Sequence, residues 1–302
     1  MTVGPATGHR TRLTAPPRPL PLVPILTNDL PRMRTAALIA IHVLAACGRP
    51  AAPPTPALPE AARLAPATAR FHLVEHRHVE QRYLEQVIMT DAVTRATVSV
   101  AIDSAPTGFA VNAMVDSIAV SGDAGVTAES VAAAAGARFR LDIAPDGSVR
   151  AVTGPGDGNP LLDHLALRMH ELVPRMPGGG AAAGAAWTDT VLTSGRTAGI
   201  PISLGVHGRH VGAAAWIELD GRHVLPLATE TDYTLSGEGE RSGQWITMAG
   251  TGTSRVQRFV GSDGVVALGI RDDTLRVTIE LQGTGGSIPL TQIRTDTLRR
   301  VN

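Results

Sequence analysis

The densest group of potential metal ligands in the chain is the segment 72–80, which reads HLVEHRHVE. Side chains alternate between the two faces of a β-strand, so its three histidines and Glu80 would share one face. Imidazoles and carboxylates bind zinc, and a zinc ion with an open coordination position activates water for hydrolysis. Because strand residues four apart are separated by roughly 13 Å, only His76 and His78 are spaced to share one ion. A metal-dependent hydrolase is one hypothesis, and a solvated strand face without metal is the alternative.

Motifs for other chemistry are absent from the sequence or poorly placed for it. His164 and His170 stand six apart in an expected helix, on different faces, so they form no zinc-binding pair. A Gly-x-Ser-x-Gly nucleophile elbow does not occur. Asp272, Asp273 and the glycines of 237–239 are expected in turns. The chain has no Lys, which excludes a P-loop lysine, a Schiff-base lysine and a Ser–Lys dyad. We therefore predict a protein that is not an enzyme and has no cofactor.

The balance of acidic and basic residues limits which partners the protein is expected to bind. The sequence holds 27 acidic and 27 basic residues, with a formal net charge of zero. A nucleic-acid partner would require a basic surface, so none is expected. Three Trp, two Tyr and four Phe are too few for the two aromatic girdles of a transmembrane β-barrel, which disfavours that alternative.

A short apolar stretch precedes the only cysteine, Cys47. Arg32 and Arg34 supply positive charge, and the apolar run 35–46 follows, interrupted only by Thr35 and His42. A membrane-spanning helix needs roughly 20 apolar residues, so this run is too short to be a permanent anchor. Positive charge, a short apolar run and small residues before a break are typical of a signal peptide.

The tetrapeptide Leu44-Ala45-Ala46-Cys47 resembles the lipobox of bacterial lipoproteins. The resemblance implies that residues 1–46 are removed and that acyl chains on Cys47 tether the protein to a membrane of the cell envelope. Gly48, where Asp commonly retains such proteins in the inner membrane, implies an outer-membrane position facing the periplasm. Thirty-two residues precede Met33, so we expect translation to start there. The alternative is a buried structural cysteine at the end of a core helix.

Beyond Cys47 the composition divides the chain. Residues 47–68 form a Pro- and Ala-rich linker, expected to be extended. Short β-type runs separated by Gly, Asp and Pro fill 69–173 and 185–302, with a Pro/Gly/Ala hinge between them. The one strong helix signal begins at Leu161, with Asn159 as cap and Pro160 in the first turn, and is expected to run to Val173. Five apolar residues should form its buried face: Leu161, Leu162, Leu165, Met169 and Leu172.

The expected fold is mainly β, of α+β type. It is an antiparallel meander, or curved half-barrel-like sheets, holding one packed helix and built from two similar halves. This architecture resembles the half-open barrels of lipid-chaperone lipoproteins. The expected function is a non-catalytic binding or scaffold module for an apolar ligand or an envelope protein. Trp187, Trp216 and Trp245 are expected as core anchors, or as one wall of a ligand site beside the helix.

Overall fold

The computed structural model describes residues 58–83, 85–123, 125–155, 159–283 and 286–301. Cys47, the expected signal peptide 1–46 and most of the linker lie outside the described residues. Within the described ranges, no helix is both long and apolar enough to cross a membrane. Those ranges contain fourteen strands and two helices, so the protein is mainly β, as predicted.

Most of the described chain forms one antiparallel sheet of twelve strands. Eleven follow one another in the order β6-β5-β4-β3-β2-β14-β13-β12-β11-β9-β8, and β10 pairs with β11 beside this path. The strands are β2 (Ala67–Tyr83), β3 (Gln86–Ala105), β4 (Gly108–Gly122), β5 (Arg138–Ile143), β6 (Val149–Thr153), β8 (Ala186–Thr197), β9 (Ile200–Gly212), β10 (Ile217–Leu219), β11 (Arg222–Arg241), β12 (Gln244–Gly261), β13 (Val266–Leu281) and β14 (Gly286–Val301). Two short strands, β1 (Ala61–Ala62) and β7 (Ala181–Ala182), pair with each other.

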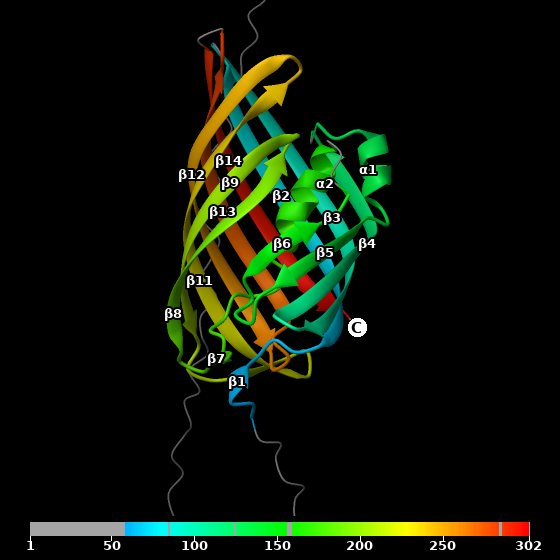
Figure 1. Cartoon of the computed structure of the whole chain (residues 1–302), viewed down its shortest axis with the longest axis vertical. Helices are drawn as coiled ribbons and strands as arrows, with labels where there is room; N and C mark the ends of the chain where they lie inside the picture. The colour runs from blue at the N-terminus through cyan, green and yellow to red at the C-terminus, as the bar shows by residue number, and fades with distance from the viewer. Residues whose placement is uncertain (1–57, 84, 124, 156–158, 284–285, 302) are drawn as a thin grey trace, which may run out of the picture. The chain divides into compact units, whose positions relative to one another are not determined.

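The sheet closes on itself almost completely (Figure 1). Strand β2 pairs along most of its length with β14, from Arg70 opposite Val301 onward. This pairing places strands from 69–173 and 185–302 in one continuous sheet. Strands β6 and β8 form the two ends of the path and do not pair with each other. The result is a nearly closed barrel. It is a more complete form of the curved, half-barrel-like sheet that the sequence predicts.

Two short helices stand beside the open side of the barrel. Helix α1 (Ala128–Ala134) is capped by Thr127, and the Ser130 N–H donates to the Thr127 hydroxyl at 3.1 Å. Helix α2 (Pro160–Met169) contacts β8 at one end of the sheet and β5 near the other. Helix α2 therefore fills the gap where the barrel stays open.

The start and the buried face of α2 confirm the prediction. The Leu161 N–H donates to Asn159 Oδ1 at 3.0 Å, and Pro160 occupies the first turn. The five expected apolar residues are all buried: Leu161, Leu162, Leu165, Met169 and Leu172. They belong to a core cluster with inward residues of β2 to β5. The helix ends at Met169 and not at Val173, since Pro174 disfavours helical backbone in the residue before it.

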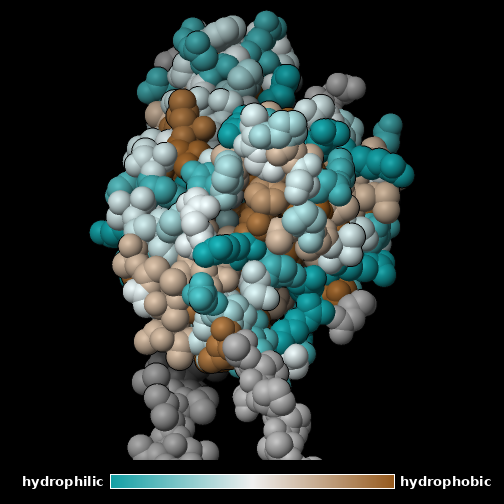
Figure 2. Space-filling model, turned by 60° about the horizontal axis from the view of Figure 1, so that its bottom comes forward, coloured by the Kyte–Doolittle hydropathy of each residue, from teal (hydrophilic) through white to brown (hydrophobic). Residues whose placement is uncertain are grey.

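The outward face of the strands is mostly polar, with scattered exposed apolar residues such as Leu192, Val211 and Ile293. On β12, for example, Thr251, Thr253, Arg255 and Gln257 are all exposed. The face in Figure 2 is mostly hydrophilic or intermediate, with hydrophobic residues in separate spots. A barrel embedded in lipid presents an apolar outward band instead. Charged side chains also lie on the inner face of this barrel.

Candidate binding site inside the barrel

The strand register brings charged side chains together on the inner face. In one row, Glu75 of β2 lies opposite Asp296 of β14, which lies opposite Arg271 of β13. Two residues further along the strands, Arg294 of β14 lies opposite Asp273 of β13. Because side chains two apart share a face, these two rows are neighbours inside the barrel. All five residues are buried or nearly so.

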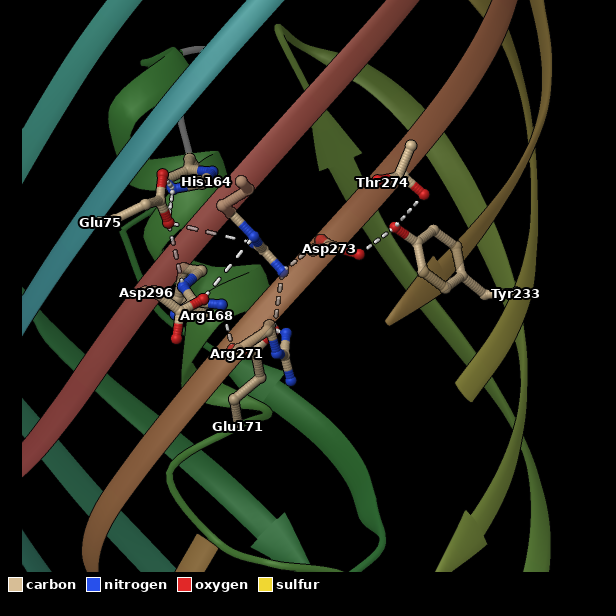
Figure 3. Close-up of polar contacts among 10 residues, drawn as sticks. Glu75, His164, Arg168, Glu171, Tyr233, Arg271, Asp273, Thr274 and Asp296 are labelled. Carbon is tan, nitrogen blue, oxygen red and sulfur yellow. Dashed lines mark hydrogen bonds and ion pairs between the residues drawn. The ribbon is translucent and has the colours of Figure 1, made fainter. Parts of the chain in front are cut away.

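Helix α2 inserts a cation between the carboxylates of the first row (Figure 3). Arg168 Nη2 lies 2.9 Å from Asp296 Oδ2, and Arg168 Nε lies 3.3 Å from Glu75 Oε2. One turn earlier on the helix, His164 Nε2 lies 3.0 Å from Glu75 Oε1. The Arg168 side chain is only 4% exposed, so the apolar face of α2 and its ion pairs fix it in the barrel together.

Glu171, just after α2, extends the network to the second row. Its carboxylate pairs with Arg168 and Arg271, and lies 3.5 Å from Arg294 Nη2. Arg294 Nη2 is 2.7 Å from Asp273 Oδ2, and Asp273 accepts a hydrogen bond from the Tyr233 hydroxyl. The network of Glu75, His164, Arg168, Glu171, Tyr233, Arg271, Asp273, Arg294 and Asp296 is called the inner network below.

The inner network keeps Glu75 and Glu171 charged. Burial alone would raise the pKa of Glu75, but His164, Arg168 and Arg294 outweigh it and hold that pKa well below its ordinary range. Burial likewise acts to raise the pKa of Glu171, and the surrounding arginines lower it to about 2. Each carboxylate therefore stabilises the fold as an anion, since its protonation would leave buried arginines without a counter-charge.

Tyr233 is held in its neutral form. Burial and the neighbouring charge of Asp273 both raise the pKa of the phenol above its ordinary value. Its ring lies over Gly252 on the next strand, where a Cβ would stand 2.3 Å from Tyr233 Cζ. Any larger residue at this position would push the ring away from Asp273.

A second buried group lies on β8 and β9. Asp189 Oδ1 is 3.1 Å from Arg175 Nη1, and Asp189 Oδ2 is 3.2 Å from His210 Nε2. On its other side, His210 Nδ1 lies 3.1 Å from Thr229 Oγ1. The imidazole also stacks on Trp187, with ring centroids 4.9 Å apart.

A cavity of about 400 Å³ separates these two groups, between α2 and the wall of β8 to β14. At one end its lining is apolar: Leu167, Ile202, Leu204, Leu235 and Leu275. At the other end three arginines face it: Arg175, Arg258 and Arg271. Ligand sites are concave, mostly apolar spaces of this size, with a few polar groups that orient the ligand. The interior of the barrel is therefore the best candidate binding site.

The residues singled out from the metal-ligand pattern lie elsewhere. His76 is exposed on the outward face of β2, opposite in direction to Glu75 and Arg77. His78 Nδ1 pairs with Asp91 Oδ1 at 2.8 Å near the surface. In the described part of the chain, no three His, Cys, Asp or Glu side chains are grouped to hold a metal. The metal site at His76 and His78 stays a prediction.

Two expectations about turns are wrong. Asp272 and Asp273 lie inside β13, and residues 237–239 lie inside β11. Adjacent aspartates and Gly-x-Gly favour turns locally, but cross-strand pairing overrides that preference here. The alternation of Arg271, Asp273 and Leu275 on one face was the signal for an inward-facing strand.

The tryptophans divide between core and surface. Trp187 and Trp216 are partly buried against a core cluster that includes Leu225 and Leu227. Trp245, at the start of β12, is 44% exposed and is not a core anchor. Only Trp187 stands near the candidate site, through its stacking on His210.

No protein-family model matches the chain, and no curated protein matches it either. Among solved structures, one match is described as "Crystal structure of Pseudomonas aeruginosa OccK2 (OpdF)". It is 7% identical, covers 78% of this chain and 98% of that chain, and has a TM-score of 0.17.

Proposed function

We propose that the protein is a cell-envelope lipoprotein, anchored through Cys47, whose barrel binds a small molecule with an apolar part in its interior cavity. The observation that carries this proposal is the cavity itself, about 400 Å³ in volume and lined at one end by leucines and isoleucine. The apolar end of such a cavity gains free energy by taking up an apolar group.

The inner network supports a binding role without catalysis. Glu75 and Glu171 are held as anions by the surrounding cations, and Tyr233 is held neutral by burial and by Asp273. General acid–base catalysis favours groups whose pKa lies near the working pH, and these shifts move the groups away from it. The inner network therefore acts as a rigid wall for the cavity.

In this proposal the anchor attaches the protein to the membrane, and the barrel holds the ligand. The lipobox resemblance places the acylated end of the chain at Cys47, and the Pro- and Ala-rich residues after it suit a spacer. A polar outer face and an apolar inner end let the barrel carry an apolar molecule through water near the membrane.

The test is native mass spectrometry of the full chain purified from a bacterial envelope and titrated with decanol. We expect a mature mass that begins at acylated Cys47 and one decanol per barrel. Leu204→Trp, which fills the apolar end of the cavity, should remove decanol binding, whereas Leu192→Trp should not. Leu192 is the matched control because it lies on the neighbouring strand with its side chain 73% exposed.

Two outcomes would contradict the proposal separately. Purified protein that still carries residues 1–46 would rule out the lipid anchor at Cys47. The interior site would be ruled out if wild type does not bind decanol. It would also be ruled out if wild type and a folded Leu204→Trp variant bind decanol equally. Thermal unfolding of both variants establishes that each is folded.

A further inference from the structure

One arginine in the cavity differs from all the arginines of the inner network. Arg258, on the inner face of β12, lines the arginine end of the cavity. Across the described residues, no ion pair or hydrogen bond reaches its guanidinium. Arg168, Arg271 and Arg294, in contrast, all pair with carboxylates.

Nearby carboxylates offset the charge of Arg258 only in part: Glu171 and Asp296 act to raise its pKa, but burial and the neighbouring arginines outweigh them. Burial, and next the positive charge of Arg271, lower the pKa of Arg258 to about 10, so it remains a cation at neutral pH. The nearest carboxylate able to help is Glu171, which already pairs with Arg168 and Arg271. Arg175, the third arginine at this end, shares Asp189 with His210. The arginine end of the cavity therefore has more cations than it has free anions.

A partly buried, unpaired cation is costly for the empty protein, and an incoming anion reduces that cost. The planar guanidinium fork fits a carboxylate or phosphate group through two parallel hydrogen bonds. An anionic group on a ligand would therefore settle at Arg258.

The apolar end lies at the right separation for the rest of such a ligand. Leu275 stands four residues beyond Arg271 on β13, roughly 13 Å along the strand. Leu204 and Leu235 pair with each other across β9 and β11, and both line the cavity with Leu275. A ten-carbon chain, about 13 Å long, would reach from Arg271 to Leu275. Leu235 lies six residues beyond Thr229, which is in register with Arg271, so only a longer chain would also contact Leu204 and Leu235.

We infer that the ligand is an amphipathic anion, with a carboxylate or phosphate head between Arg258 and Arg271 and an apolar chain that runs along the cavity toward Leu275. This inference rests on the proposed interior site and specifies the chemistry of its occupant. Arg271 and Arg175 add positive charge beside the head group, while Arg258 supplies the free hydrogen-bond donors.

The test is calorimetric titration of the full mature chain with four probes: decanoate, decyl phosphate, decanol and inorganic phosphate. We expect the two amphipathic anions to bind at least about ten-fold more tightly than decanol, since a hydrogen bond to a charged group outweighs a neutral one. Arg258→Gln should weaken both anions by about ten-fold or more and leave decanol unchanged. Arg258→Lys, which keeps the charge without the fork, should lose less.

The control is Arg255→Gln, on the same strand with a side chain that faces outward and is 83% exposed. It should change the affinity for none of the probes. Decanol bound as tightly as decanoate would overturn the inference and leave the proposed interior site standing. Failure of all three ten-carbon probes would overturn both. Inorganic phosphate bound as tightly as decyl phosphate would overturn the apolar part, because a free anion would then suffice. The wild-type comparison decides the question even if Arg258→Gln does not fold.

Discussion

The inner network and the arginine end of the cavity use the same chemical groups with opposite results. In the inner network, Arg168 reaches three carboxylates at once, and each of these three also reaches a second cation. At the arginine end, Arg258 reaches none among the described residues. Paired charge holds α2 against the barrel wall, whereas unpaired charge is available to a ligand. The number of counter-charges in contact, and not the presence of arginine, separates a structural site from a binding site in this barrel.

The largest effect should come from the centre of the inner network. Arg168→Met leaves Glu75 and Asp296 buried without their main cation, and we expect a loss of about 3 to 5 kcal/mol in the free energy of unfolding. Urea denaturation measures the loss. The control is Arg299→Met, because Arg299 pairs with Asp220 on the outer face and is 59% exposed. It should cost less than about 0.5 kcal/mol. Equal losses in the two variants would erase the distinction between network and surface.

The next effect concerns acid stability. In the unfolded chain Glu171 titrates near its ordinary pKa of 4.5, and in the folded barrel its pKa is about 2. The folded state thus binds fewer protons between these values, so its stabilisation is complete above about pH 4.5 and is lost as pH falls through about 2. Glu75 shifts in the same direction. For Glu171 the shift corresponds to roughly 3 kcal/mol.

The measurement is the urea midpoint as a function of pH. Glu171→Gln should lower stability at neutral pH and flatten the decline between pH 4.5 and 2, because the titrating group is gone. Glu238→Gln, on the exposed outer face of β11, should leave the curve unchanged. A Glu171→Gln curve that runs parallel to wild type would show that the carboxylate is not held as an anion.

The smallest effect should have the opposite sign. Arg258→Met removes an unpaired, partly buried cation and offers apolar surface to the cavity, so we expect a gain of about 1 kcal/mol in the ligand-free protein. Thermal and urea unfolding of delipidated protein measure it. A destabilisation as large as that of Arg168→Met would mean that Arg258 is part of the inner network, and the contrast between the two regions would fail.

Some features of the barrel could be predicted because their cause is local. Helix α2 is specified by the Asn159 cap, Pro160 and a periodic apolar face, all within a dozen residues. The mainly β character follows from alternation along the strands.

The candidate site could not be predicted, because register creates it. Nothing near Glu75 in the sequence indicates that it will face Arg168 and Arg294 from other parts of the chain. The histidine pattern at 72–80 drew attention to the outer face of β2, whereas the functional side chain of that segment is the glutamate pointing the other way. Inward polar residues are stable only when partners arrive from other strands, and the sequence does not show which strands will meet.

The pairing of β2 with β14 has a consequence for biogenesis. The sheet unites the earliest and latest long strands of the described chain, with Arg70 opposite Val301. During synthesis, β2 emerges long before its second partner, so one edge of β2 stays open until β14 follows. Contacts of such wide sequence separation form slowly, and an open strand edge invites pairing with other chains. The barrel is therefore completed only once β14 is available, and chaperones that shield strand edges would have their greatest effect in that interval.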